Sequence, residues 1–308
     1  MLDWQRRGVL VTPRGDDAWS THAQAPTVVP LTDELWRVYF AGRDRANRGA
    51  IFAVDVEPEH GMRVVRVHDR PFLTPGRSGG FDEDGVGPAC ALRDGARIVL
   101  YYVGISSAPG MPNRHAIGMA ISDDGLAFER LQGEAIFSPG EGDPYSTSIP
   151  YVGRAAAGFE MWYHSTTGWY DEAGRREATY TIRHAVSSDG IRWARTAGTA
   201  LRGEDATAQS TRPWVAAGRI WFSRRGLAFR NGAPGAYRIV CAPLDVRGRC
   251  ATVRAEPINF ANPPEPGDWD GEMQAYASIA QARDRLVLFY NGNGFGAKGF
   301  GWAEAALS

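Results

Sequence analysis

The chain has 308 residues, with 34 Lys and Arg against 35 Asp and Glu and a formal net charge of −1. This balance argues against a nucleic-acid scaffold or an acidic tail protein, because such proteins normally present a field of one sign. The chain also holds 37 Gly, 19 Pro, 10 Trp, 11 Tyr and 13 Phe, spread along its length. Abundant turn residues among aromatics predict many short strands rather than long helices.

The first residues, Met1–Arg7, lack the basic segment and apolar core of a signal peptide, and no apolar run reaches the length of a membrane span. We therefore expect a soluble, cytoplasmic protein with neither membrane nor nucleic-acid partners. The three cysteines, Cys90, Cys241 and Cys250, have no CxxC spacing. They are predicted to be free thiols, with a contact between Cys241 and Cys250 in a hairpin as the alternative.

Five segments share a small or polar lead-in, a proline or small residue, and a short apolar run. Their register positions are 26, 88, 150, 213 and 277, so the spacings are 62, 62, 63 and 64 residues. A nearly constant period over the whole chain predicts a repeat architecture. The five segments are Ala25–Val29, Gly87–Ala91, Ile149–Val152, Arg212–Val215 and Tyr276–Ile279.

Further predicted strands follow each of these first strands. The second strands end in aromatics: Trp36–Phe40, Ile98–Tyr102, Glu160–Tyr163, Ile220–Phe222 and Val287–Tyr290. The third strands are Ala50–Val54, Ala116–Ala120, Ile182–Val186, Tyr237–Val240 and Gly301–Ala303. Fourth strands are predicted at Met62–Val67, Phe128–Leu131, Trp193–Thr196 and Ala251–Ala255. Asp124-Gly125 and Asp189-Gly190 provide tight hairpin turns between third and fourth strands.

The fifth repeat ends at Ser308 without a fourth strand, whereas Gly8–Val11 belongs to no repeat. The simplest closure places this N-terminal strand at the outer edge of the last blade. The prediction is one all-β domain over residues 1–308, a five-bladed β-propeller with four-stranded antiparallel blades. The predicted blades are at about 20–70, 82–135, 143–200, 209–257, and 270–308 together with 8–12. A pair of β-sandwiches is the alternative, but it does not explain the period.

One end of such a propeller carries the lead-ins to the first strands and the loops between the second and third strands. The lead-ins are polar: Ser20–Gln24, Phe81–Gly85, Asp143–Thr147, Gln209–Arg212 and Asp268–Gln274. The loops are rich in Arg, Asn, His and aromatics: Gly42–Asp44, Asn113–His115, His164–Tyr170, Arg224–Arg225 and Asn291–Asn293. A functional site is therefore expected at this mouth.

The repeat, the S-x-D-G-x-x-W/F turns and the polar lead-ins resemble the five-bladed propellers of glycoside hydrolase families 43, 32, 68 and 130. The resemblance covers essentially the whole chain and is closest to a subgroup of glycosidase-like proteins found with glycan or natural-product biosynthesis. The blocks that carry it are Phe81–Val86, Asp143–Ser146, Arg212–Val215, Trp269–Met273 and Tyr290–Gly294. One departure limits what it implies: families 43 and 32 carry an aspartate before the first strand of the first blade, whereas His22–Pro26 has no carboxylate.

The remaining carboxylates at the mouth are the candidates for acid–base work. Glycosyl transfer or hydrolysis needs a protonated acid for the leaving oxygen and a carboxylate as base or nucleophile. We predict Glu272 as the main catalytic residue, with Asp84 or Asp143 as its partner. The alternative is that these residues, like Asp82, only cap the turns into their strands.

Basic and polar groups at the same mouth predict a carbohydrate ligand that can be anionic, because arginine suits carboxylate and phosphate. The predicted ligand-binding residues are His22, Gln24, Arg43, Asp44, Asp82, Arg114, Tyr145, His164, Arg212, Arg224 and Asn291. No HxH, HExxH or CxxC spacing occurs, so neither a metal site nor a cofactor is predicted, with a channel ion left open.

Two classes of function remain. The first is a carbohydrate-active enzyme that cleaves or transfers a glycosidic or sugar-derived bond. The second is a repurposed or non-hydrolytic propeller that binds or rearranges a sugar-like or biosynthetic intermediate, which the missing aspartate of the first blade favours. A protein-interaction propeller would instead require apolar exposed patches at the mouth.

Overall fold

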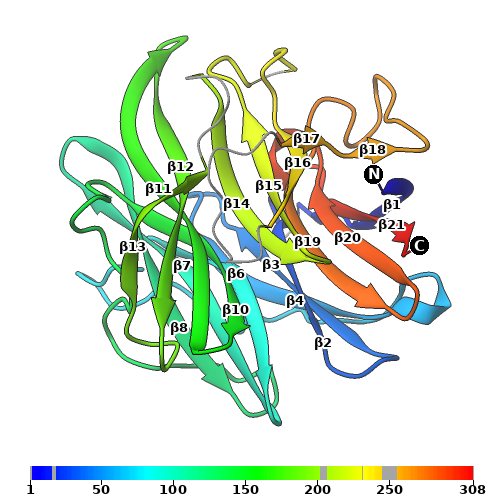
Figure 1. Cartoon of the computed structure of the whole chain (residues 1–308), viewed down its shortest axis with the longest axis horizontal. Helices are drawn as coiled ribbons and strands as arrows, with labels where there is room; N and C mark the ends of the chain where they lie inside the picture. Colours follow the sequence, from blue (N-terminus) through cyan, green and yellow to red (C-terminus); the bar gives the residue numbers. More distant parts are fainter. Residues whose placement is uncertain (1, 16–18, 202–206, 231, 245–254, 308) are drawn as a thin grey trace.

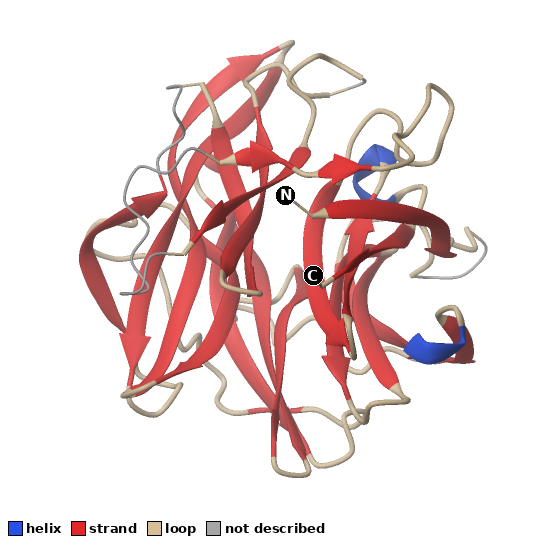
Figure 2. Cartoon of the chain, turned by 45° about the vertical axis from the view of Figure 1, so that its right-hand side comes forward, coloured by secondary structure: helices blue, strands red, loops and turns tan. Residues whose placement is uncertain are grey.

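The computed structural model describes residues 2–15, 19–201, 207–230, 232–244 and 255–307. Nearly all regular structure is strand, with two short 3-10 turns at Pro58–His60 and Asn293–Gly296 (Figure 2). In the described part of the chain, no helix is long and apolar enough to cross a membrane. The fold is the predicted five-bladed β-propeller, built from five antiparallel blades.

The strands of the blades follow the chain in order. The first blade is β2 (Gln24–Pro30), β3 (Trp36–Arg43), β4 (Gly49–Glu57) and β5 (Arg63–Val67). The second is β6 (Gly85–Asp94), β7 (Arg97–Ala108), β8 (Met111–Ser122) and β9 (Glu129–Arg130). The third is β10 (Thr147–Ala155), β11 (Gly158–Glu172), β12 (Arg175–Ser187) and β13 (Ala194–Leu201). The fourth is β14 (Gln209–Ala216), β15 (Arg219–Arg225), β16 (Arg238–Pro243) and β17 (Glu256–Pro257).

The fifth blade joins the two ends of the chain. It consists of β19 (Ala275–Ala282), β20 (Arg285–Asn291), β21 (Phe300–Ala306) and the N-terminal β1 (Asp3–Val11), which pairs antiparallel with β21. The short β18 (Asn259–Phe260) adds a parallel pairing to the outer side of β1. Figure 1 shows the dark-blue and red ends of the chain together in this blade. The predicted closure by the N-terminal strand is confirmed, although that strand is longer than Gly8–Val11.

The innermost strands β2, β6, β10, β14 and β19 contact one another in sequence, and β19 contacts β2, so they close a ring around the propeller axis. Apolar clusters fill the spaces between blades, because both faces of each sheet are covered by a neighbouring sheet. Val29, Leu100 and Tyr102 pack together between the first and second blades, and Cys90, Met161 and Tyr163 between the second and third. This interleaving explains why the strands are apolar on both faces.

The two Asp-Gly turns also tie neighbouring blades together. Gly125 and Gly190 have φ values of 70° and 75°, the left-handed conformation expected in these hairpins. Tyr39 of the first blade donates its hydroxyl to the Gly125 carbonyl at 2.7 Å. Tyr101 of the second blade does the same to Gly190 at 3.0 Å. In these two blades a tyrosine of the second strand thus hydrogen-bonds the Asp-Gly turn of the next blade and holds the two blades together.

Two sequence predictions fall partly beyond the described residues. Cys90 and Cys241 are buried free thiols. Cys250, and with it the alternative contact to Cys241, lies outside the described residues. The fourth strand predicted at 251–255 also lies largely outside them, and the described outer strand of that blade is β17.

Candidate functional site

The innermost strands share an irregularity at the position where the sequence repeat is centred. The pairing of each of these strands with its neighbour shifts there. In four blades the residue at the shift is not glycine and still has a positive φ: Ala25 (56°), Ile149 (46°), Arg212 (53°) and Tyr276 (62°). Such backbone costs of order 1–3 kcal/mol per residue and gathers at functional sites. The register positions of the sequence repeat therefore coincide with strained residues on the inner strands, which together form a ring around the propeller axis.

Arg212 bridges this ring from within. Its guanidinium donates to the Pro26 carbonyl at 2.8 Å, to the Thr27 hydroxyl at 2.8 Å and to the Pro88 carbonyl at 3.1 Å. The side chain is fully buried, and burial lowers the pKa of Arg212 to about 10 because desolvation disfavours the charged form. Arg212 therefore connects the fourth blade to the first and second blades. Its guanidinium is hydrogen-bonded to these inner strands rather than directed into the open mouth of the propeller.

A cavity of about 550 Å³ opens on the axis beside this ring. Residues from the second to the fifth blades line it: Pro112, Asn113, His115, Ser146, Ser148, Ile149, His164, Thr166, Trp169, Arg175, Arg176, Glu177, Ala178, Tyr180, Thr211, Arg230, Tyr237 and Tyr276. We call it the axial pocket. Its volume lies within the usual range for small-molecule sites. Of the predicted binding residues, only His164 is among those that line it.

A pair of tyrosines forms part of the wall. The hydroxyls of Tyr180 and Tyr237 are hydrogen-bonded to each other, and Arg225 Nε donates to the Tyr180 hydroxyl at 2.5 Å. Burial raises the pKa of Tyr180 to about 12, so both phenols remain protonated at neutral pH. The shared bond uses one of the two phenolic protons. The other proton is therefore available to an acceptor.

Two histidines line the pocket without adding charge. His164 is bonded to the Thr211 hydroxyl at 2.8 Å and to the Thr166 hydroxyl at 3.1 Å, and its ring lies 4.5 Å from that of Tyr180. Burial lowers the pKa of His164 to about 3 and that of His115 to about 4. Both are therefore neutral imidazoles near pH 7, where they can donate or accept hydrogen bonds.

Charged groups of the pocket lie on β12 and on the loop after β15. The Arg230 guanidinium donates two hydrogen bonds to the Glu177 carboxylate, at 2.6 and 3.1 Å. Arg175 and Arg176, at the start of β12, are exposed, whereas Glu177 is buried. Glu177 is the one carboxylate among the described residues that line this pocket.

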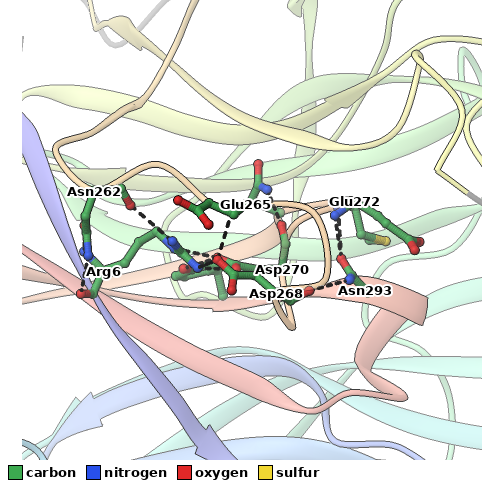
Figure 3. Close-up of polar contacts among 10 residues, drawn as sticks. Arg6, Asn262, Glu265, Asp268, Asp270, Glu272 and Asn293 are labelled. Carbon is green, nitrogen blue, oxygen red and sulfur yellow. Dashed lines mark hydrogen bonds and ion pairs between the residues drawn. The ribbon is translucent and has the colours of Figure 1, made fainter.

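Glu272 lies in a neighbouring hollow. This second cavity, of about 230 Å³, is lined by Phe229, Gly232, Ala236, Glu272, Met273, Gly294 and Phe295, and it shares Arg175 and Arg230 with the axial pocket. The Asn293 side chain accepts from the Glu272 amide at 2.9 Å, which holds the backbone there. Figure 3 shows the Glu272 side chain directed away from Asp268, Asp270 and Arg6. Glu272 is thus exposed beside Arg230 rather than bound into the turn.

The other predicted carboxylates have structural partners. Asp143 is fully buried and accepts from the Tyr163 hydroxyl at 2.8 Å and from Arg195 Nε at 2.6 Å. Asp82 is held in the same way by Tyr102 at 3.1 Å and Arg130 at 2.8 Å. Asp270 repeats the arrangement with Tyr290 and Arg6. In each case the tyrosine stands 20 residues after the aspartate.

These three clusters join the lead-in, the second strand and the outer strand of one blade. The hydroxyl and guanidinium together satisfy a buried carboxylate, which would otherwise be costly. The geometry therefore gives these lead-in aspartates a structural role, although through tyrosine and arginine side chains rather than through the turn capping weighed from the sequence. Asp84 differs: it is half-buried and accepts from the Ser107 hydroxyl at 2.7 Å, away from the axial pocket.

Residues predicted on the first blade are hydrogen-bonded to neighbouring residues of the same blade. Arg43 donates to Gln24 and, at 2.9 Å, to the Asn47 side chain. Asp44 caps its own loop by accepting from Arg48. His22 contacts the Thr21 hydroxyl at 2.9 Å and lines a separate cavity of about 190 Å³ beside β1, where burial lowers its pKa to about 4.

The remaining predicted residues are dispersed. Arg114 is exposed on β8, and Tyr145 packs edge-on against Trp169 at 6.3 Å, next to the pocket. Arg224 lies over Phe222 at 5.5 Å. Asn291 is fully buried and bonded to Ala23, Ala25 and Gly299. The structure thus brings His164 into the pocket, Tyr145 against Trp169 of its wall and Glu272 into the adjoining hollow. Gln24 and Arg43 lie close to Tyr276, which also lines the pocket.

Sequence reasoning missed Glu177, Arg230, Tyr180 and Tyr237. The available signal was the segment 164–181 between the predicted second and third strands of the third repeat, which is longer than its counterparts in the other repeats. There β11 and β12 run as a long hairpin beyond the predicted strands. That extension carries Arg175, Arg176, Glu177 and Tyr180 to the mouth. Among the described residues, no group of three or more His, Cys, Asp and Glu side chains could hold a metal ion.

Comparisons with known proteins place this geometry in context. No protein family model matches the chain. It is 34% identical over 310 residues to "Uncharacterized protein Rv1502" of Mycobacterium tuberculosis H37Rv, which covers 98% of this chain and 99% of the relative. The protein MT1551 of M. tuberculosis CDC 1551 matches at the same identity and coverage.

Among solved structures, one described as a glycoside hydrolase superposes with a TM-score of 0.71 at 15% identity, covering 100% of this chain and 92% of the other. The β-1,2-mannobiose phosphorylase of Listeria innocua gives 0.64 at 12% identity, with 96% and 93% covered. A family 32 β-fructofuranosidase of Bombyx mori gives 0.61 at 13% identity, with 92% and 60% covered. The chain therefore belongs to the family of the mycobacterial protein Rv1502, and its fold is the five-bladed propeller of these glycoside hydrolases and phosphorylases.

Proposed function

We propose that the protein is a carbohydrate-active enzyme that cleaves or transfers a glycosidic or sugar-derived bond in the axial pocket. The observation that carries this proposal is a cavity of about 550 Å³ with a buried carboxylate, Glu177, on its wall and a second carboxylate, Glu272, in the adjoining hollow. Hydroxyls, neutral imidazoles and Trp169 supply the polar contacts and the stacking surface that a sugar requires.

The two carboxylates have different surroundings, which suits different roles. Both oxygens of Glu177 accept hydrogen bonds from Arg230, so this group is placed to act as a base or nucleophile. Glu272 is exposed, and its carboxylate has no hydrogen bond or ion pair to another described residue. It is therefore free to turn toward a bound ligand, and with Glu177 as base or nucleophile it takes the role of acid for the leaving oxygen. Glu177 replaces Asp84 and Asp143 as the partner of Glu272, because those two are engaged elsewhere.

The test uses Glu177→Gln and Glu272→Gln, with Glu134→Gln as the control, since Glu134 is an exposed residue paired with Arg77. Each protein is assayed on a panel of glycosides, with water and with inorganic phosphate as acceptor. Losing the acid or the base should reduce kcat by about 100-fold or more. Glu272→Gln should keep the wild-type melting temperature, whereas Glu177→Gln also breaks the buried pair with Arg230, so its fold is checked by circular dichroism. Turnover at the wild-type rate in both variants would show that the assigned pair is wrong.

A second candidate function is a propeller that binds or rearranges a sugar-like intermediate without hydrolysis. The observation in its favour is the first lead-in, residues 22–26, which has no carboxylate where glycoside hydrolase families 43 and 32 have one. Binding of a sugar with no turnover across the panel, and with unchanged affinity in both glutamine variants, would favour this candidate.

A further inference from the structure

We infer that the axial pocket takes a sugar derivative with an acidic substituent, a carboxylate or a phosphoryl group. Its uncharged hydroxylated part would lie against the inner wall, and the acidic group would lie at the rim beside Arg175, Arg176 and Arg230. This inference rests on the proposed function, and it adds which part of the ligand is charged and where that charge is held.

The inner wall is polar and uncharged. The Ser148 hydroxyl is fully buried, lines the pocket and has no hydrogen-bond partner among the described residues. The Tyr180–Tyr237 pair retains one proton for an outside acceptor, and His164 is neutral. A buried hydroxyl without a partner is destabilising, because it has lost its hydrogen bonds to water. The Ser148 hydroxyl and the available tyrosine proton therefore suit the hydroxyls of a sugar ring, and the neutral His164 adds no charge beside them.

Arginines outnumber carboxylates among the residues that line the pocket. Three arginines and one carboxylate line the pocket in the described chain, which leaves an excess of two positive charges. The chain as a whole carries −1, so this excess is local rather than a property of the surface in general. Asp171 and Glu172 stand across the hairpin from Arg176 and Arg175, but no ion pair joins these arginines to an acid among the described residues.

Arg230 links the two hollows. It uses its Nε and Nη2 atoms on Glu177, and a guanidinium has five N–H donors, so further donors remain for a ligand. Arg230 and Arg175 line both the axial pocket and the hollow that contains Glu272. An oxyanion between these two arginines would receive charge-assisted hydrogen bonds, and it would be separated from the neutral inner wall.

The experiment measures binding, so it does not depend on turnover. Isothermal titration compares glucose, glucuronate and glucose 6-phosphate at low and high salt. At least one acidic sugar should bind about tenfold tighter than glucose, and added salt should reduce that advantage because the rim arginines are exposed. The acidic sugar that binds tighter identifies a carboxylate or a phosphoryl group as the substituent.

Variants locate the two parts of the site. Arg175→Ala with Arg176→Ala should remove the advantage of the acidic sugar over glucose. Arg192→Ala is the matched control, because it removes an exposed arginine of the same blade that pairs with Asp189. Ser148→Ala and Tyr237→Phe should weaken glucose and the acidic sugar by similar factors, with folding checked by circular dichroism.

Three outcomes would overturn the inference: glucose binding as tightly as both acidic sugars, an acidic preference that survives the double arginine variant, or no binding by either acidic sugar at millimolar concentration. Failure of the proposed enzyme activity is distinguishable. Selective binding of an acidic sugar without turnover would support the inference and contradict the activity. Turnover of neutral glycosides without a preference for acidic ones would support the activity and contradict the inference.

Discussion

Arg6 and Asp270 stand 264 residues apart, and the Arg6 guanidinium donates to both carboxylate oxygens of Asp270, at 3.0 and 2.6 Å. Asp270 is fully buried, and Arg6 also reaches Asp268 at 2.8 Å. Figure 3 shows Arg6 extending from the N-terminal strand into the lead-in of the fifth blade. The pair therefore closes the propeller, joining β1 to the turn before β19.

Replacing Arg6 should destabilise the contact between β1 and the rest of the fifth blade. In Arg6→Ala the Asp270 carboxylate would stay buried without its guanidinium, and breaking a buried pair from one side costs about 3–5 kcal/mol. Urea denaturation should show that loss in the free energy of unfolding. Arg7→Ala is the control, since Arg7 makes a more exposed pair with Glu304 and should change stability by less than about 1 kcal/mol. Equal effects in both variants would contradict a special role for Arg6.

Asp143 should contribute to stability rather than to catalysis. Asp143→Asn would leave Arg195, whose side chain is 29% exposed, without its charged partner and should lower the free energy of unfolding by about 2–4 kcal/mol. Asp94→Asn, in an exposed pair with Arg154, should have little effect. If Asp143→Asn keeps its stability but loses turnover, the catalytic role predicted from the sequence stands.

Arg212 should behave as a structural residue of the axis. Arg212→Met removes three hydrogen bonds and leaves the buried carbonyls of Pro26 and Pro88 without this donor. A loss of about 2–4 kcal/mol in the free energy of unfolding is expected. Thermal denaturation with and without a ligand would separate the two roles. If the variant keeps wild-type stability but no longer binds sugar, Arg212 is a ligand-binding residue, as the sequence predicted.

The burial of His164 predicts a loss of stability at acidic pH. Its pKa is about 3 in the folded protein against 6.5 for the free side chain, so the unfolded chain binds more protons between these values. The free energy of unfolding should therefore fall as the pH drops from 6.5, with about 1–2 kcal/mol lost to this residue by pH 5.

Denaturation at pH 6.5 and pH 5 checks this in the wild type, in His164→Asn and in His60→Gln, where His60 is an exposed histidine. The His164 variant should lose less stability than the wild type over this range. The His60 variant should follow the wild type. A wild-type slope that His164→Asn leaves unchanged would contradict the expected contribution.

The architecture follows from the amino-acid sequence alone. The aromatic second strands and the Asp-Gly turns follow local rules of strand and turn formation, and the period near 63 residues repeats them along the chain. Each of these features appears in the fold. Closure by the N-terminal strand was also predictable, because a blade lacking an outer strand needs one from elsewhere in the chain. These features depend on patterns that are repeated along the chain.

Which carboxylates face the pocket depends on contacts between blades and could not be read from the sequence. Asp143 and Glu177 are both acidic residues of the third blade near the mouth, yet Tyr163 and Arg195 hold one inside the blade and Arg230 of the next blade holds the other at the pocket. Side-chain direction depends on partners supplied by other strands. The lining of the axial pocket comes from four blades, so no single repeat could reveal its charge or its composition.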